Sequence, residues 1–161
     1  MTRSDVALAT SNLLLGTAVG AGINQSIFVM PRWFASPPES LRLVRDRNPG
    51  KFWIPLQAGA AVALGAALAL NRRNASRARL LKMAVGCYVA TWVSTAAYFA
   101  PEIIRLSRAD GELPASEITR RGKRWMNLTW LRHGALAAAW VLTVPALAGR
   151  QPTLSLGRLR A

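Results

Sequence analysis

Apolar residues fall into four long stretches along the chain, and charged residues gather between them. No charge occurs in the 26 positions between Asp5 and Arg32, or in the 20 positions between Lys51 and Arg72. A helix rises about 1.5 Å per residue, so about 20 apolar residues cross the hydrocarbon core of a bilayer. The pattern therefore predicts four membrane-spanning helices, at about 6–30, 52–70, 80–101 and 126–148.

The connections between these stretches predict short helices at the membrane surface. In the first connection, Ser36 and Glu39 have the spacing of a capping box with prolines between them, and Asn48 begins an Asn-Pro-Gly stop. In the third connection, a helix is expected from about Ser116 that ends in basic residues beside Trp125. We therefore expect an all-α integral membrane four-helix bundle with short interfacial helices in the first and third connections.

In this prediction residues 1–161 form a single membrane domain with a flexible basic tail over 149–161. The N-terminal stretch, however, has a second interpretation. The first apolar stretch could instead be a cleaved signal peptide, because Ala-Val-Gly at 18–20 resembles a cleavage site. Polar residues at 10–12 interrupt the apolar run, however, and this favours a retained helix.

The excess of positive charge changes meaning once its location is known. The chain carries 21 Lys and Arg against 7 Asp and Glu, a net charge of +14. In a soluble protein this balance would indicate nucleic acid binding. Here the charge lies mainly in the connections, so we expect a lipid bilayer with anionic head groups as the partner and no nucleic acid. Three aromatic residues are expected to anchor at the same interface, namely Trp33, Phe34 and Trp53.

Charge density also predicts an orientation. The numbers of basic residues on the two sides are similar, but the second connection packs four arginines into positions 72–79. The positive-inside rule places this connection in the cytoplasm, so we expect both termini there. The membrane that we expect is the inner (cytoplasmic) membrane of a bacterium.

Small residues recur at helical spacing in the first two spans. Gly16 and Gly20 form a GxxxG pair, and Ala61, Gly65 and Ala69 repeat the pattern. Such residues let helix backbones approach closely in lipid. They predict close packing within the bundle or a homodimer.

The sequence lacks the motifs that several kinds of enzyme chemistry require. Cys87 is the single cysteine, which excludes an internal disulfide, and its position within a span predicts a packing role. The chain has no glycine-rich nucleotide-binding motif, no CxxC and no HExxH. We expect no metal and no other cofactor.

One layer of the predicted bundle collects polar residues. In an antiparallel bundle the end of the first span, the start of the second, the end of the third and the start of the fourth meet at one face. The polar residues at these places are Asn24, Gln25, Gln57, Glu102, Arg132 and His133. Asn24, Gln57 and Arg132 lie about 8–10 Å deep by helix rise, and Glu102 stands at the end of the third span. Polar groups are costly at this depth and usually face the bundle interior, so the layer is a candidate pocket.

Each member of this layer has an alternative role. Glu102 and Arg132 have compatible depths for an ion pair, and His133 could exchange a proton near neutral pH. Arg132 could instead extend to lipid phosphates, Glu102 could be solvated, and His133 could serve packing. The amide side chains could be interhelical hydrogen-bonding groups.

Three short segments resemble a known family. The segment 124–132 (RWMNLTWLR) resembles the start of the last helix in the anthrone oxygenase-like family of small four-helix membrane proteins, which bacteria carry as a domain of unknown function. The segment 15–22 (LGTAVGAG), followed by Pro31, resembles the first helix of that family. The segment 98–101 (YFAP), before an Asp-Gly linker, resembles the third. The matched positions are Pro101, Trp125, Trp130 and Arg132, whereas Glu102 and Thr129 stand where many members have asparagine.

The resemblance implies oxidation of a hydrophobic aromatic or quinol-like small molecule by dioxygen, without metal or flavin. A base would remove a proton from the substrate and a cation would stabilise the enolate. We expect His133, Arg132 and Glu102 at the catalytic centre. The substrate contacts are expected from Asn24, Gln25, Gln57, Trp125 and Trp130. The alternative is a non-enzymatic membrane protein that binds a lipid, quinone or protein partner through the same pocket.

Overall fold

The computed structural model describes residues 2–109 and 112–148, and all regular structure in these ranges is helical. The basic tail expected over 149–161, and Asp110 and Gly111 of the third connection, lie outside the described residues. The elements in chain order are α1 (Arg3–Asn24), η1 (Gln25–Val29), α2 (Met30–Trp33), η2 (Glu39–Leu41), α3 (Arg42–Arg47), α4 (Gly50–Asn71), α5 (Ala75–Ser94), η3 (Thr95–Phe99), α6 (Ala100–Ser107) and α7 (Ala115–Ala148). Of these, η1 and η3 are π-helical turns and η2 is a 3-10 turn.

Four continuous helical segments are long and apolar enough to cross a membrane: Arg3–Trp33, Gly50–Asn71, Ala75–Ser107 and Ala115–Ala148. Their outer faces carry large exposed apolar side chains, among them Leu13, Val62 and Leu131. In water such a surface would drive aggregation, whereas in a bilayer it contacts lipid tails. The chain is an integral membrane protein, and the predicted all-α four-helix bundle is confirmed.

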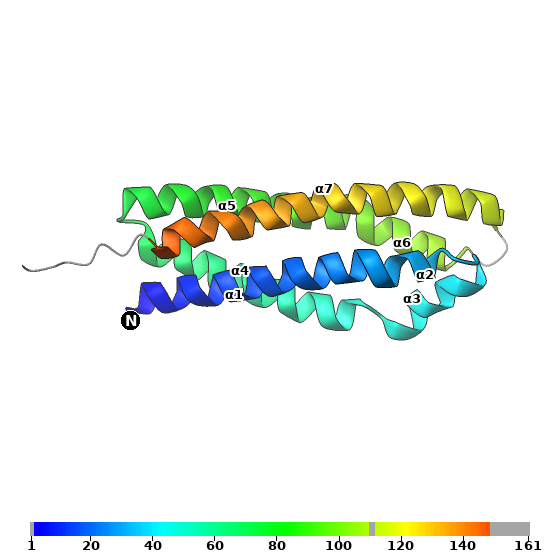
Figure 1. The fold of residues 1–161 in the computed structure, drawn as a ribbon, viewed down its shortest axis with the longest axis horizontal. Helices are drawn as coiled ribbons and strands as arrows, with labels where there is room; N and C mark the ends of the chain where they lie inside the picture. Colours follow the sequence, from blue (N-terminus) through cyan, green and yellow to red (C-terminus); the bar gives the residue numbers. More distant parts are fainter. Residues whose placement is uncertain (1, 110–111, 149–161) are drawn as a thin grey trace, which may run out of the picture.

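The four segments run alternately up and down along one elongated bundle (Figure 1). α1 packs against α4 and α7, and α5 packs against α7, while α4 and α5 share a smaller contact. The start of α1, the turn between α4 and α5, and the end of α7 lie at one end of the bundle. The other end holds α2, α3 and α6.

The core has two parts along the bundle. The first lies between the long helices and is built from small and branched residues, including Leu8, Leu15, Leu64 and Leu81. Such side chains let the helices pack closely in lipid. The second lies at the α2, α3 and α6 end and is aromatic, with Trp33, Phe34, Phe99 and Trp125 all buried. Trp33 and Phe34 are therefore core residues and not the interfacial anchors that the sequence suggested.

The first connection holds the predicted short helix. It begins with the η2 turn and continues as α3 to Arg47, after which Asn48 takes the left-handed conformation with φ of 38° and ends it. The expected capping box is wrong, because no side chain caps η2 at Pro38. Instead the Ser40 hydroxyl accepts a hydrogen bond from the Ser36 amide and donates one to the Trp33 carbonyl.

The third connection differs from the prediction. The amphipathic segment expected as a separate helix from Ser116 is the first part of α7, which runs without a break from Ala115 to Ala148. Within this part Gly122 lies directly against the Phe34 ring, so there is no room for a β-carbon at that position. The basic segment is therefore a rigid extension of the fourth span.

Two π turns interrupt the long helices at equivalent places. η1 lies in the first span and η3 in the third, and each precedes a proline, Pro31 and Pro101, by two residues. A proline ring clashes with the carbonyl four residues earlier in an α-helix, and here that carbonyl belongs to Ile27 or Ala97, inside the π turn. Widening the helix to a π turn relieves this clash. π turns occur frequently at functional sites.

The small residues of the first two spans lie on different faces of their helices. Gly16 packs inside the bundle, since a β-carbon there would lie 3.0 Å from Nε1 of Trp140. Gly20 and Gly65 have open space around them, and Ala61 and Ala69 are exposed. The first GxxxG residue thus takes part in packing within the chain, and the homodimer stays a prediction.

Candidate functional site

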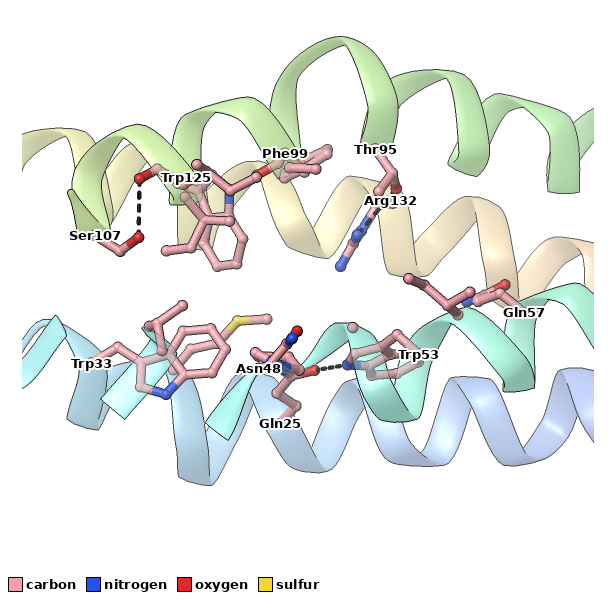
Figure 2. Close-up of a pocket in the computed structure, with 18 of the residues that line it drawn as sticks. Gln25, Trp33, Asn48, Trp53, Gln57, Thr95, Phe99, Ser107, Trp125 and Arg132 are labelled. Atoms are coloured by element: carbon pink, nitrogen blue, oxygen red, sulfur yellow. Dashed lines mark hydrogen bonds between the residues drawn. The ribbon is translucent and has the colours of Figure 1, made fainter. Parts of the chain in front are cut away.

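A cavity of about 720 Å³ lies between the long helices at the α2, α3 and α6 end of the bundle (Figure 2). This volume is in the range of small-molecule binding pockets. One wall is formed by η1, α2, α3 and α4, and the other by α5, η3, α6 and α7. The polar residues that line it are Gln25, Arg45, Asn48, Gln57, Thr91, Thr95, Ser107, Arg108, Arg132 and His133.

The guanidinium of Arg132 projects from α7 into this cavity (Figure 2). It donates a hydrogen bond of 3.2 Å to the Thr95 hydroxyl, and its central carbon lies 4.8 Å from the centroid of the Phe99 ring. Both partners belong to the π turn η3. Among the residues that the structure describes, no carboxylate lies within ion-pair distance of Arg132. The cation therefore has only neutral partners in a low-dielectric setting.

Glu102 does not form the expected ion pair with Arg132. Its carboxylate accepts two hydrogen bonds from Arg121, of 2.7 Å from Nε and 2.6 Å from a terminal nitrogen. The two side chains are only 13% and 22% exposed. The rigid extension of α7 places Arg121 beside α6, and the bidentate geometry satisfies both groups. Glu102 also does not line the cavity, so the structure separates it from Arg132 and His133.

His133 follows Arg132 on α7 and is buried, with the cavity on one side. Its Nε2 lies 2.8 Å from the Ser26 hydroxyl in the π turn η1. The Cε1 edge of the ring lies against Gly22, where an added β-carbon would lie 2.7 Å from Cε1 and 3.0 Å from Nδ1. The Trp130 and His133 rings are nearly perpendicular, with a centroid distance of 5.9 Å. Consecutive residues of α7 thus contact the two π turns, His133 at η1 and Arg132 at η3.

Two of the three predicted amide side chains line the cavity. Gln25 accepts a hydrogen bond of 2.7 Å from the indole of Trp53, which joins α4 to η1 (Figure 2). Gln57 accepts one of 2.7 Å from the Tyr88 hydroxyl, which joins α4 to α5. Both amides therefore also serve interhelical hydrogen bonding. Asn24 is exposed on α1 and does not line the cavity.

Of the two predicted tryptophans, one lines the cavity and the other does not. Trp125 lines the cavity, is buried, and donates a hydrogen bond of 3.0 Å to the Phe99 carbonyl in η3. Its ring packs against Trp33 and Phe99. Trp130 is about half exposed on the outer face of α7 and lies outside the cavity lining.

Other lining residues were not predicted. Thr95 and Phe99 hold Arg132, and the aromatic walls include Trp33, Trp53 and Trp92. An available signal was the proline inside the first and third spans, because Pro31 and Pro101 each follow a π turn by two residues. Among the described residues, no group of three His, Cys, Asp or Glu side chains could share a metal ion.

The fold and the cavity define an integral membrane four-helix bundle with a ligand-sized site near one end. Protein-family models give no match to this chain, and neither curated proteins nor solved structures give one. The resemblance to the anthrone oxygenase-like family therefore stays a prediction that rests on the short motifs.

Proposed function

We propose that the protein binds a lipophilic aromatic compound in the cavity and that Arg132 holds an acidic or electron-rich oxygen of this ligand. The observation that carries the proposal is the guanidinium in the cavity, which contacts the Thr95 hydroxyl and the Phe99 ring and has no ion-pair partner among the described residues. A charge away from water is costly unless it is paired, and at membrane depth it usually serves a function. An anionic oxygen of a ligand would supply the missing partner.

The rest of the wall supports an aromatic ligand. Trp33, Trp53, Phe99 and Trp125 line the same cavity, and aromatic faces and edges favour stacked or T-shaped contacts with another ring. Apolar residues outnumber the polar ones in the lining, which is typical of pockets that fix the orientation of a mostly apolar ligand with a limited set of polar groups.

The proposed reaction is oxidation of such a ligand by dioxygen without metal or flavin. A base takes one proton from an activated methylene, and Arg132 stabilises the resulting enolate. The enolate carbon combines with dioxygen and a proton to give a hydroperoxide. Loss of water then leaves a ketone, so that the methylene compound and O₂ become the ketone and H₂O. His133 is the candidate base because it adjoins Arg132 and lines the same cavity.

The second candidate function is binding without chemistry, and one contact favours it. The Nε2 atom of His133 is already paired with the Ser26 hydroxyl, and Ser26 does not line the cavity. To act as a base through Nε2, His133 would have to exchange Ser26 for the substrate. A histidine held in this way could instead shape the cavity wall.

Binding and oxidation are tested with two different probes on the full chain in lipid nanodiscs. Binding is measured as the rise in unfolding temperature caused by 2-anthrol, a phenol that lacks the reactive methylene. We expect Arg132→Gln to abolish this rise and Arg124→Gln, an exposed arginine on the same helix, to keep it. No rise with the unaltered chain would contradict the binding proposal.

Oxidation is measured as oxygen consumption with anthrone. We expect the unaltered chain to consume oxygen above the uncatalysed rate, and His133→Gln, which keeps a side chain able to bond Ser26, to lower the rate at least about tenfold. An unchanged rate would remove His133 from the mechanism. Binding of 2-anthrol without any oxidation of anthrone would establish the second candidate.

A further inference from the structure

We infer that the cavity opens sideways into the bilayer between α4 and the α5–η3–α6 helix, and that its ligand carries a hydrocarbon chain that stays in the lipid. The inference rests on the proposed binding function and names the class of ligand, an aromatic acid or phenol with a long alkyl or prenyl chain.

The seam between α4 and the third span is the loosest of the bundle. α4 packs closely on α1 and has a smaller contact with α5. Beyond α5, neither η3 nor α6 makes a substantial contact with α4. The two walls of the cavity therefore separate along this seam.

The rim of the cavity along the seam is apolar. Ile54 of α4, Ile104 of α6 and Trp92 of α5 all line the cavity and are 65%, 47% and 41% exposed. A residue that is exposed and also lines the cavity marks a place where the cavity meets the outside. These residues lie in the segments that cross the membrane, so the outside at this place is lipid.

The end of the cavity near the membrane surface is different. There α3 contacts both α2 and α6, and its buried Val44 forms part of the cavity wall. The rim at this end is polar, with Asn48 and Arg108 exposed. The wide apolar part of the rim is therefore the seam, and a ligand dissolved in the bilayer reaches Arg132 without first passing through water.

This geometry determines what the ligand can carry. The acidic oxygen pairs with Arg132 inside, and the ring lies among the aromatic side chains. A chain attached to the ring leaves through the seam between Ile54 and Ile104. Because such a chain is in lipid both before and after binding, its length has no effect on affinity at a fixed ratio of probe to lipid.

The test compares 2-anthrol with a 2-anthrol that bears a dodecyl chain, at the same ratio of probe to lipid in nanodiscs. The readout is the rise in unfolding temperature of the full chain. We expect equal rises for the two probes. In the double variant Ile54→Trp, Ile104→Trp, which narrows the seam, the rise with the dodecyl probe falls to less than about half of the rise with 2-anthrol in the same variant.

Val62→Trp provides the control, because Val62 is exposed on the same helix and lies outside the cavity lining. This variant should leave both rises unchanged. A smaller rise with the dodecyl probe on the unaltered chain, or equal rises in the narrowed variant, would overturn the lateral opening and leave the proposed binding intact. No rise with either probe on the unaltered chain would overturn the binding function and this inference together.

Discussion

The contact between His133 and Gly22 permits a sharp test of the site, through Gly22→Ala. A β-carbon at Gly22 would lie 2.7 Å from Cε1 of His133. The ring would have to move by about 0.7 Å to reach ordinary van der Waals contact at 3.4 Å. That movement would disturb the 2.8 Å hydrogen bond to Ser26. Overpacking costs about 1–3 kcal/mol, and a disturbed hydrogen bond adds up to about 1 kcal/mol.

Gly20→Ala is the matched control for this variant. Gly20 lies two residues earlier in α1 and has no atom within 4 Å of an added β-carbon. Both substitutions gain the same helix propensity, about 1 kcal/mol, so the difference between them isolates the contact with His133. We expect Gly22→Ala to be less stable than Gly20→Ala by about 1–4 kcal/mol, the sum of the two costs.

The assay is unfolding of the full chain in mixed micelles of a mild detergent and dodecyl sulfate, followed by circular dichroism. A double-mutant cycle completes it, because His133→Ala removes the ring that the new methyl group meets. Gly22→Ala should then cost at least about 1 kcal/mol less in the His133→Ala background. Equal stability of the two glycine variants within about 0.5 kcal/mol would refute the packing of His133 on Gly22.

Two further predictions concern contacts that join the helices, measured by the same unfolding assay. Glu102→Gln should cost about 1–3 kcal/mol because it breaks a bidentate, largely buried pair with Arg121. Glu117→Gln, which breaks the exposed pair with Arg120 within α7, should cost less stability than Glu102→Gln because water screens that pair, and equal losses would contradict this ranking. Tyr88→Phe should cost about 1 kcal/mol because it removes the hydrogen bond to Gln57. Tyr98→Phe, whose hydroxyl has no hydrogen-bond partner among the described residues, should be neutral, and a loss as large as that of Tyr88→Phe would indicate a general effect of removing a hydroxyl.

The four spans could be predicted because an uncharged apolar run of about 20 residues is typical of a membrane-spanning helix. The ends of the helices could not. The apolar pattern stops at the membrane surface, whereas α7 continues back to Ala115 because Gly122 lets it pack against Phe34. The same extension brings Arg121 to Glu102, a pairing between segments that charge pattern alone does not determine.

The depth of the site residues along the bundle could be predicted from the sequence, but the direction in which each side chain points could not. Counting residues from the interface placed Gln25, Gln57, Arg132 and His133 in one layer, and all four line the cavity. Asn24 has the same depth but is exposed, because depth along a helix does not fix which way a side chain points. That direction depends on how each helix is wound, and the π turns at η1 and η3 change the winding close to this layer.

The paired π turns affect how this chain should be aligned with others. Each turn contains one residue more than an α-helical turn, so the residues after it are rotated by about 100° relative to an unbroken helix. A related chain with an ordinary α-helix at either place would be one residue shorter there. Its buried positions would match those of this protein on both sides of a one-residue gap near Ile27 or Ala97. An alignment without that gap would compare core residues of one chain with lipid-facing residues of the other.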